Sequence, residues 1–229
     1  MKDSKLYADK IKKLHRSLKR TAAKVQPVTY EDPLEALTYG ILCEHVTSSQ
    51  AQAAQKRLTR HFVDLNDLRV ARPDEIAESF GEDSKAVLDT AVRLTRVLTA
   101  VFNRAHALTL TAIKKLGKRP ARQFVETLDG VSPFAVHYCM LTALQSHAIP
   151  VNDRMIEYLK AEGLIHPGSE AVGVEGFLSK LVPAREGYEF YVLLRAQSEA
   201  WRPSEKKAGA AMASAEAARK GLKKKQDQP

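Results

Sequence analysis

Apolar residues recur at helical spacing along most of the chain. A typical run is Leu34, Leu37, Ile41 and Leu42, and a wider apolar face lies between residues 84 and 102. Apolar positions three and four residues apart form one face of an α-helix, whereas a strand alternates apolar and polar residues. No convincing alternating run of five residues occurs, and no repeat of fixed period is present. The pattern predicts an all-α protein of nine or ten helices.

Composition narrows the class of protein. The chain has 229 residues, of which 44% are hydrophobic and 28% are charged, as in ordinary globular proteins. No window approaches eighteen uninterrupted apolar residues, and the first residues lack the apolar stretch of a secretory signal. Cys43 and Cys139 are too few for a disulfide framework or a four-thiolate metal site. We expect a cytoplasmic protein, nucleoid-associated if bacterial. We expect it to bind no membrane and to hold no metal through cysteine.

Positive charge is concentrated at both ends of the chain. Residues 1–24 contain nine Lys or Arg against two Asp or Glu, and residues 202–229 contain eight against three, while the whole chain carries a net charge of +9. The central part is therefore mildly acidic. Cationic ends are typical of proteins that bind a polyanion, such as nucleic acid or an anionic membrane surface. The alternative is that they only aid solubility.

These features divide the chain into three parts. Residues 1–27 are predicted to be a basic N-terminal helix or arm, and Pro27 ends it. Residues 28–201 are predicted to be the helical domain. Residues 202–229 contain almost no large apolar residue, and we expect this basic Ala/Lys-rich tail to be disordered.

A predicted helix–turn–helix unit at 121–147 carries the most information. Its turn reads Leu128-Asp129-Gly130-Val131-Ser132, and helices are expected on both sides. Glycine suits a turn position with positive φ, and Val131 would fill the space between the helices. Amides at such a corner, Gly130, Val131 and Ser132 here, can bind phosphate oxygens without reading base sequence.

The unit resembles the helix–hairpin–helix motif, and the chain from about 32 to 201 resembles the helix–hairpin–helix (HhH-GPD) DNA glycosylases, most closely the endonuclease III-like branch. Weak matches occur in the family's order, and they are the segments 33–37, 41–48, 80–86, 128–131, 149–152 and 177–183. The resemblance implies a two-lobed all-α fold with an interdomain cleft. It also implies double-stranded DNA as the partner and base-excision repair as the process. We expect a monomer.

The resemblance also implies where the reaction would occur. Family members use an Asp carboxylate, and bifunctional members add a Lys whose amine forms a Schiff base with the sugar. In the matching register Phe134 stands at the lysine position and Asn152 at the aspartate position, which predicts that lyase activity is lost. Asp153, one residue further, is a candidate carboxylate, although an acidic residue in the first helical turn also favours the helix dipole.

Other candidate DNA contacts follow from the same register. His45 matches a family Gln that fills the hole left by a flipped base, although a lone His is more often structural. Five basic residues precede the hairpin and could bind flanking phosphates or simply form a solvated face: Lys114, Lys115, Lys118, Arg119 and Arg122. Ala/Lys sequence replaces the family's four-cysteine loop after Trp201, so no iron–sulfur cluster and no other cofactor is expected.

Three functions remain open from the sequence. The first is a DNA-binding member of the repair family with its lyase activity lost. The second is an active monofunctional DNA glycosylase that uses Asp153. The third is a non-enzymatic scaffold that binds nucleic acid or protein through its basic ends.

Overall fold

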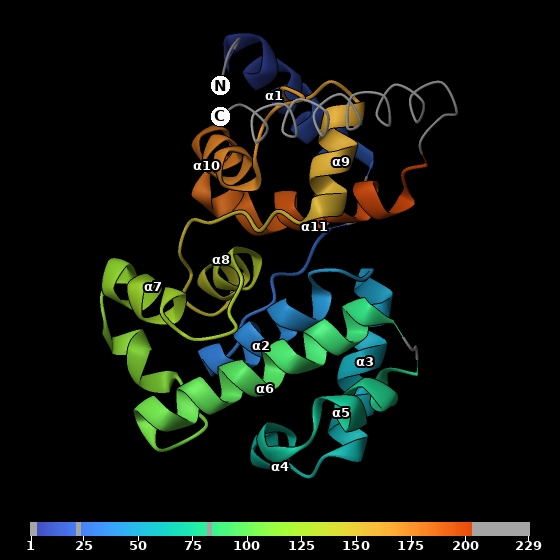
Figure 1. Cartoon of the computed structure of the whole chain (residues 1–229). Helices are drawn as coiled ribbons and strands as arrows, with labels where there is room; N and C mark the ends of the chain where they lie inside the picture. Colours follow the sequence, from blue (N-terminus) through green and yellow to red (C-terminus); the bar gives the residue numbers. More distant parts are fainter. Residues whose placement is uncertain (1–3, 22–23, 82–83, 203–229) are drawn as a thin grey trace, which may run out of the picture.

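The computed structural model describes residues 4–21, 24–81 and 84–202, and within these ranges the chain is helical, with no strand. This confirms the all-α prediction. The described residues form eleven α-helices and two short 3-10 helices (Figure 1). Their bounds are α1 Ser4–Thr21, α2 Pro33–Cys43, α3 Ser48–His61, α4 Leu65–Val70, α5 Pro73–Phe80, α6 Lys85–Ala105, η1 Thr111–Lys115, α7 Lys118–Glu126, α8 Pro133–Thr142, α9 Asp153–Ala161, α10 Ala171–Leu181, η2 Ala184–Glu186 and α11 Gly187–Ala200.

Side-chain caps begin several of these helices. Asp32 accepts a hydrogen bond from the amide of Leu34 at the start of α2, where Pro33 takes the first position. Thr47 and Gln50 form a reciprocal capping box at the start of α3. These caps satisfy amides that have no partner inside the helix, so the local sequence determines where the helices begin.

The helices pack around two hydrophobic cores, which divide the molecule into two lobes (Figure 1). The first lobe contains most of α2 to α8, and the long helix α6 crosses it with Leu94, Val97 and Leu98 buried. The second lobe contains α1, α9, α10 and α11 around Phe190, Met155 and other apolar residues. This is the two-lobed arrangement that the resemblance implied.

Helix α1 is part of the second lobe. The sequence placed it in a separate arm at 1–27, but its apolar stripe is buried in the second core, with Ile11 only 1% exposed and Leu18 only 7% exposed. The basic tail predicted for 202–229 lies outside the described residues from position 203 onward.

The two lobes meet along α2 and α8. A Cβ atom at Gly40 of α2 would lie 3.0 Å from the Cα atom of Ala135 on α8, so the two helices cross very closely. Cys43, Phe134 and Tyr138 extend from the same two helices into the second core. Helices α2 and α8 therefore connect both cores.

A buried histidine lies where α8 meets the second lobe. His137 is 6% exposed, and its Nε2 atom lies 2.9 Å from Nη2 of Arg122 and 4.0 Å from Oε2 of Glu175 on α10. Burial lowers the pKa of His137, and the Arg122 charge lowers it further, against the opposing carboxylates Glu175 and Glu126. Burial likewise lowers the pKa of His15 on α1.

The corner between α7 and α8 packs directly against α6. Gly130 has φ +84°, and a Cβ atom at this position would lie 2.8 Å from Cβ of Arg96 and 3.1 Å from the carbonyl oxygen of Arg93. Both the backbone conformation and the contact with α6 therefore require glycine.

Replacing Gly130 with alanine is expected to destabilise the protein by about 2 kcal/mol or more, because it adds left-handed strain and an overlap with the α6 backbone. Gly176→Ala is the matched control, since no atom lies within 4 Å of its added Cβ. That change should be neutral or stabilising by about 0.5–1 kcal/mol. Urea unfolding measures both, and equal stability of the two variants would contradict the packing.

Stability is expected to fall as the pH drops below about 6.5, the ordinary pKa of histidine. His15 and His137 resist protonation in the folded state, so the unfolded state takes up more protons as the pH falls. The midpoint of urea unfolding should be lower at pH 5.5 than at pH 7.5. The double variant His15→Gln/His137→Gln should show a smaller difference, and an unchanged pH dependence would contradict the assignment.

Candidate functional site

The α7–α8 corner presents backbone amides at the start of α8. Ser132 caps this helix by accepting a hydrogen bond from the amide of Ala135, and Pro133 takes the first helical position. The amides of Gly130, Ser132 and Phe134 have no hydrogen-bond acceptor among the described residues. Unpaired amides at a helix N-terminus are suited to binding an anion such as a phosphate oxygen. Val131 is partly buried against the first core, and its amide, which the sequence offered as a phosphate donor, donates to the carbonyl of Leu128 at 3.4 Å.

Two arginines of α6 flank this corner. Arg96 forms a two-pronged ion pair with Asp129, with N–O distances of 2.8 and 2.9 Å, and this pair offsets the acidic residue in the turn. The carbonyl oxygen of Arg93 also lies near Gly130, and the Arg93 side chain pairs with Glu44 at 2.9 Å. Neither arginine was among the sequence candidates, although charged positions on a long amphipathic helix were a usable signal.

The side chain at the family's lysine position is part of the second core. Phe134 is 3% exposed, and its ring centroid lies 6.4 Å from that of Tyr191. The guanidinium carbon of Arg195 lies 6.0 Å from the same ring. Position 134 therefore carries no nucleophile and has a packing role.

The side chain at the family's aspartate position caps a helix. Oδ1 of Asn152 accepts a hydrogen bond from the amide of Met155 at the start of α9, and Nδ2 donates to the carbonyl of Glu44, both at 3.0 Å. The first bond caps α9, and the second joins this helix to the loop after α2. The amide of Asn152 thus has a structural role and carries no negative charge.

A depression of about 400 Å³ opens beside Asn152, and it brings together residues from the loop after α2 and the start of α9. Its lining consists of Glu44, His45, Val46, Asn152, Asp153, Arg154 and Glu157. Nε2 of His45 lies 3.8 Å from Oε2 of Glu44. The sequence-predicted residues His45, Asn152 and Asp153 therefore share one site. Glu44 and Glu157, which were not among the sequence candidates, add two further carboxylates.

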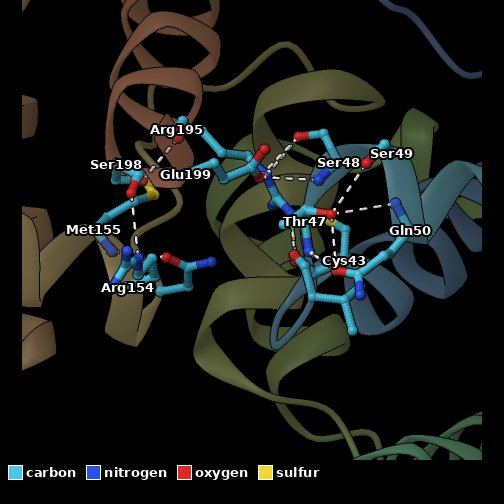
Figure 2. Close-up of polar contacts among 12 residues, drawn as sticks. Cys43, Thr47, Ser48, Ser49, Gln50, Arg154, Met155, Arg195, Ser198 and Glu199 are labelled. Atoms are coloured by element: carbon cyan, nitrogen blue, oxygen red, sulfur yellow. Dashed lines mark hydrogen bonds and ion pairs between the residues drawn. The ribbon is translucent and has the colours of Figure 1, made fainter. Parts of the chain in front are cut away.

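Behind this depression a buried arginine connects the two lobes (Figure 2). Arg195 of α11 is 3% exposed and donates to the carbonyls of Cys43 and Val46 at 2.7 and 2.8 Å. It also bonds to Ser48 and Glu199. Since every one of these contacts is internal, Arg195 is a structural residue that closes this part of the cleft.

Another cavity, of about 320 Å³, is lined by Arg195 together with residues of both lobes. Five of its lining residues are tyrosines, namely Tyr30, Tyr39, Tyr138, Tyr188 and Tyr191. Burial raises the pKa of all five, that of Tyr30 to about 12, so their hydroxyls stay neutral. The cavity therefore offers aromatic faces and neutral hydroxyl groups.

The basic residues before the hairpin lie away from the turn. Lys114 donates to the carbonyl of Glu31 and Lys118 to that of Gln145. Arg122 pairs with Glu126 and contacts His137. Lys115 is exposed at the end of η1, and Arg119 is exposed in the first turn of α7, a helix that rises about 13 Å before the turn. The cations beside the corner are instead Arg93 and Arg96.

Metal ligands are absent from the described part of the chain, where no group of three or more His, Cys, Asp or Glu residues could hold an ion. Cys43 and Cys139 are free and buried, and burial raises the pKa of both thiols, that of Cys139 to about 12. The segment after Trp201, where the family's iron–sulfur loop would follow, lies almost wholly outside the described residues. The absence of a cofactor stays a prediction. Among the described residues, no helix is long and apolar enough to cross a membrane.

Comparison with known proteins identifies the fold. No protein-family model and no curated protein sequence matches the chain. Solved structures do. A trapped endonuclease III–DNA covalent intermediate matches with a TM-score of 0.64 and 15% identity over 83% of this chain and 85% of that chain. The Clostridium acetobutylicum 8-oxoguanine glycosylase/lyase bound to DNA matches with a TM-score of 0.64 and 14% identity, over 86% and 71%.

A thermostable thymine-DNA glycosylase matches with a TM-score of 0.60 and 16% identity, over 88% of this chain and 89% of that chain. These matches cover both lobes, and all three proteins are helix–hairpin–helix DNA glycosylases. The chain has the fold of the helix–hairpin–helix DNA glycosylases.

Proposed function

We propose that the protein binds double-stranded DNA through the α7–α8 corner as a homologue of the base-excision-repair glycosylases, and that it lacks lyase activity. The unpaired amides of the corner would hold a phosphate, and Arg96 would offset the charge of Asp129, which would otherwise repel it. The solved structures of this fold that include DNA support this partner.

The observation that carries the loss of lyase activity is the burial of Phe134 at the lysine position, at 3% exposure. A lyase of this type needs an amine that attacks the sugar and forms an imine. None of the residues that line the depression is a lysine. The neighbouring Asn152 cannot replace the carboxylate electrostatically, and losing one such group typically lowers a rate by about 10²–10³.

The test combines binding and trapping on one abasic duplex. Fluorescence anisotropy should show binding that weakens steeply with added salt, because phosphate contacts release counterions. Borohydride added to the same complex should trap no covalent adduct, while a bifunctional endonuclease III run in parallel should be trapped. An adduct with this protein would overturn the loss of lyase activity, and the absence of salt-dependent binding would overturn the DNA-binding role.

A second candidate, a monofunctional DNA glycosylase, is favoured by the carboxylates of the depression. Asp153 is exposed at the start of α9 and lines the depression together with Glu44. A monofunctional glycosylase needs a carboxylate that activates water and stabilises a cationic sugar, but no amine. Asp153 or Glu44 would supply this carboxylate beside Asn152.

Base release from a panel of duplexes with damaged bases distinguishes this candidate from the first. If the protein is a monofunctional glycosylase, it releases a base, and Asp153→Asn lowers the rate by about 10² or more. Glu157→Gln is the control, because it removes a carboxylate at the edge of the same depression, one turn further along α9. No base release across the panel would eliminate this candidate, and release that Asp153→Asn leaves unchanged would exclude Asp153.

A further inference from the structure

The outer face of α1 is a continuous basic surface. Five exposed cations lie on it: Lys5, Lys12, Lys13, Arg16 and Arg20. At 100° per residue, four of these side chains fall within about 80° of one another and Lys13 lies at the margin of the same face. Asp9 is the one carboxylate on this face of the helix.

The second lobe holds this face in place. The opposite side of α1 is buried through Ile11 and Leu18, and the ring of His15 packs edge-on against Phe190 at 5.0 Å. Lys10 donates to the carbonyl of Gly163 at 2.7 Å. The cations therefore project from a docked helix.

The five cations of this face outnumber its single carboxylate, Asp9. Within the part of the chain that the structure describes, none of the five cations takes part in an ion pair. The nearby carboxylates of Glu186 and Glu189 pair with Lys19 at 3.5 and 3.2 Å. The face is therefore free to attract an anionic partner.

The packing of α1 favours a phosphate backbone over a membrane. A basic amphipathic helix binds a membrane by inserting its apolar side between lipids, but here that side is buried in the second core. Leu6 is the exposed large apolar residue that remains on α1. From Lys5 to Arg20 the face spans about 22 Å, and duplex DNA carries one charge per about 1.7 Å of its axis, so several phosphates fit along it.

We propose that the outer face of α1 is a second contact for the backbone of duplex DNA. This inference rests on the proposed DNA-binding function and extends it to the other lobe. The hairpin corner lies on α6 in the first lobe, whereas α1 packs with α10 and α11 in the second (Figure 1). The two lobes then bind the duplex through separate surfaces.

The test compares full-length variants of equal charge in duplex-binding titrations over a range of salt. One variant changes the five cations of the α1 face to Gln. Its matched control changes five exposed cations elsewhere to Gln, namely Lys56, Arg60, Arg72, Lys85 and Lys180, none of which takes part in an ion pair within the described residues. A third variant, Arg96→Gln, weakens the hairpin corner. Urea unfolding checks that all three remain folded.

We expect the α1 variant to bind at least tenfold more weakly near 0.15 M salt and to have a salt slope smaller by about 2 or more, with the control near wild type. Equal loss in the α1 variant and the control would overturn the proposal, because it would reflect net charge alone. An α1 variant that binds like wild type would overturn it too. Binding to phosphatidylserine vesicles that depends on the α1 face, with unchanged DNA affinity, would assign the face to membranes.

The results for the different variants distinguish a failure of this inference from a failure of the proposed function. If Arg96→Gln weakens binding and the α1 variant does not, the hairpin contact stands and the second contact fails. If the wild-type protein binds no duplex, both fail.

Discussion

The buried guanidinium of Arg195 is the interaction on which the relation between the two lobes depends. It comes from α11 in the second lobe and donates to the carbonyls of Cys43 and Val46, where α2 of the first lobe ends. A charge at 3% exposure is tolerated only when hydrogen bonds replace its water, and removing one partner of a buried pair typically costs about 3–5 kcal/mol. The bonds to Ser48 and Glu199 complete this replacement.

The position of Arg195 also explains why an aromatic residue fits at 134. The guanidinium lies 6.0 Å from the Phe134 ring, a distance at which an aromatic face attracts a cation. A lysine amine here would place a second positive charge beside Arg195 in a poorly solvated site, where like charges repel strongly. Phe134 therefore suits its position beside Arg195, whereas the charged form of a lysine would be disfavoured there. Asn152 is also used for structure, since its Oδ1 atom caps α9 and its Nδ2 atom joins α9 to the loop after α2.

In the proposed function, the charged surfaces that would bind DNA are separate from the positions of Phe134 and Asn152. Phe134 and Asn152 are used for packing and capping, whereas the cations of the α1 face lie on an exposed surface. Arg93 and Arg96 stand beside the hairpin corner, and Arg96 offsets Asp129, which would otherwise repel a phosphate. Helix α1 presents its cations from the other lobe. A backbone-binding protein needs such surfaces and does not need a reactive pair.

The sequence alone determined the features that depend on local physics. Helical periodicity gave the all-α class, caps such as Asp32 and Thr47 gave helix starts, and Gly130 indicated a corner with positive φ. The resemblance to the family placed Phe134 and Asn152 at its reactive positions.

Tertiary structure decided which side chains meet. Glu44 lies with Asp153 in the depression. Arg93 and Arg96, and not the lysines that precede the hairpin, lie beside the corner. Both contacts join helices that are distant in sequence. The packing of α1 into the second core was also a tertiary outcome, since a thin apolar stripe on a basic helix does not reveal which surface will bury it.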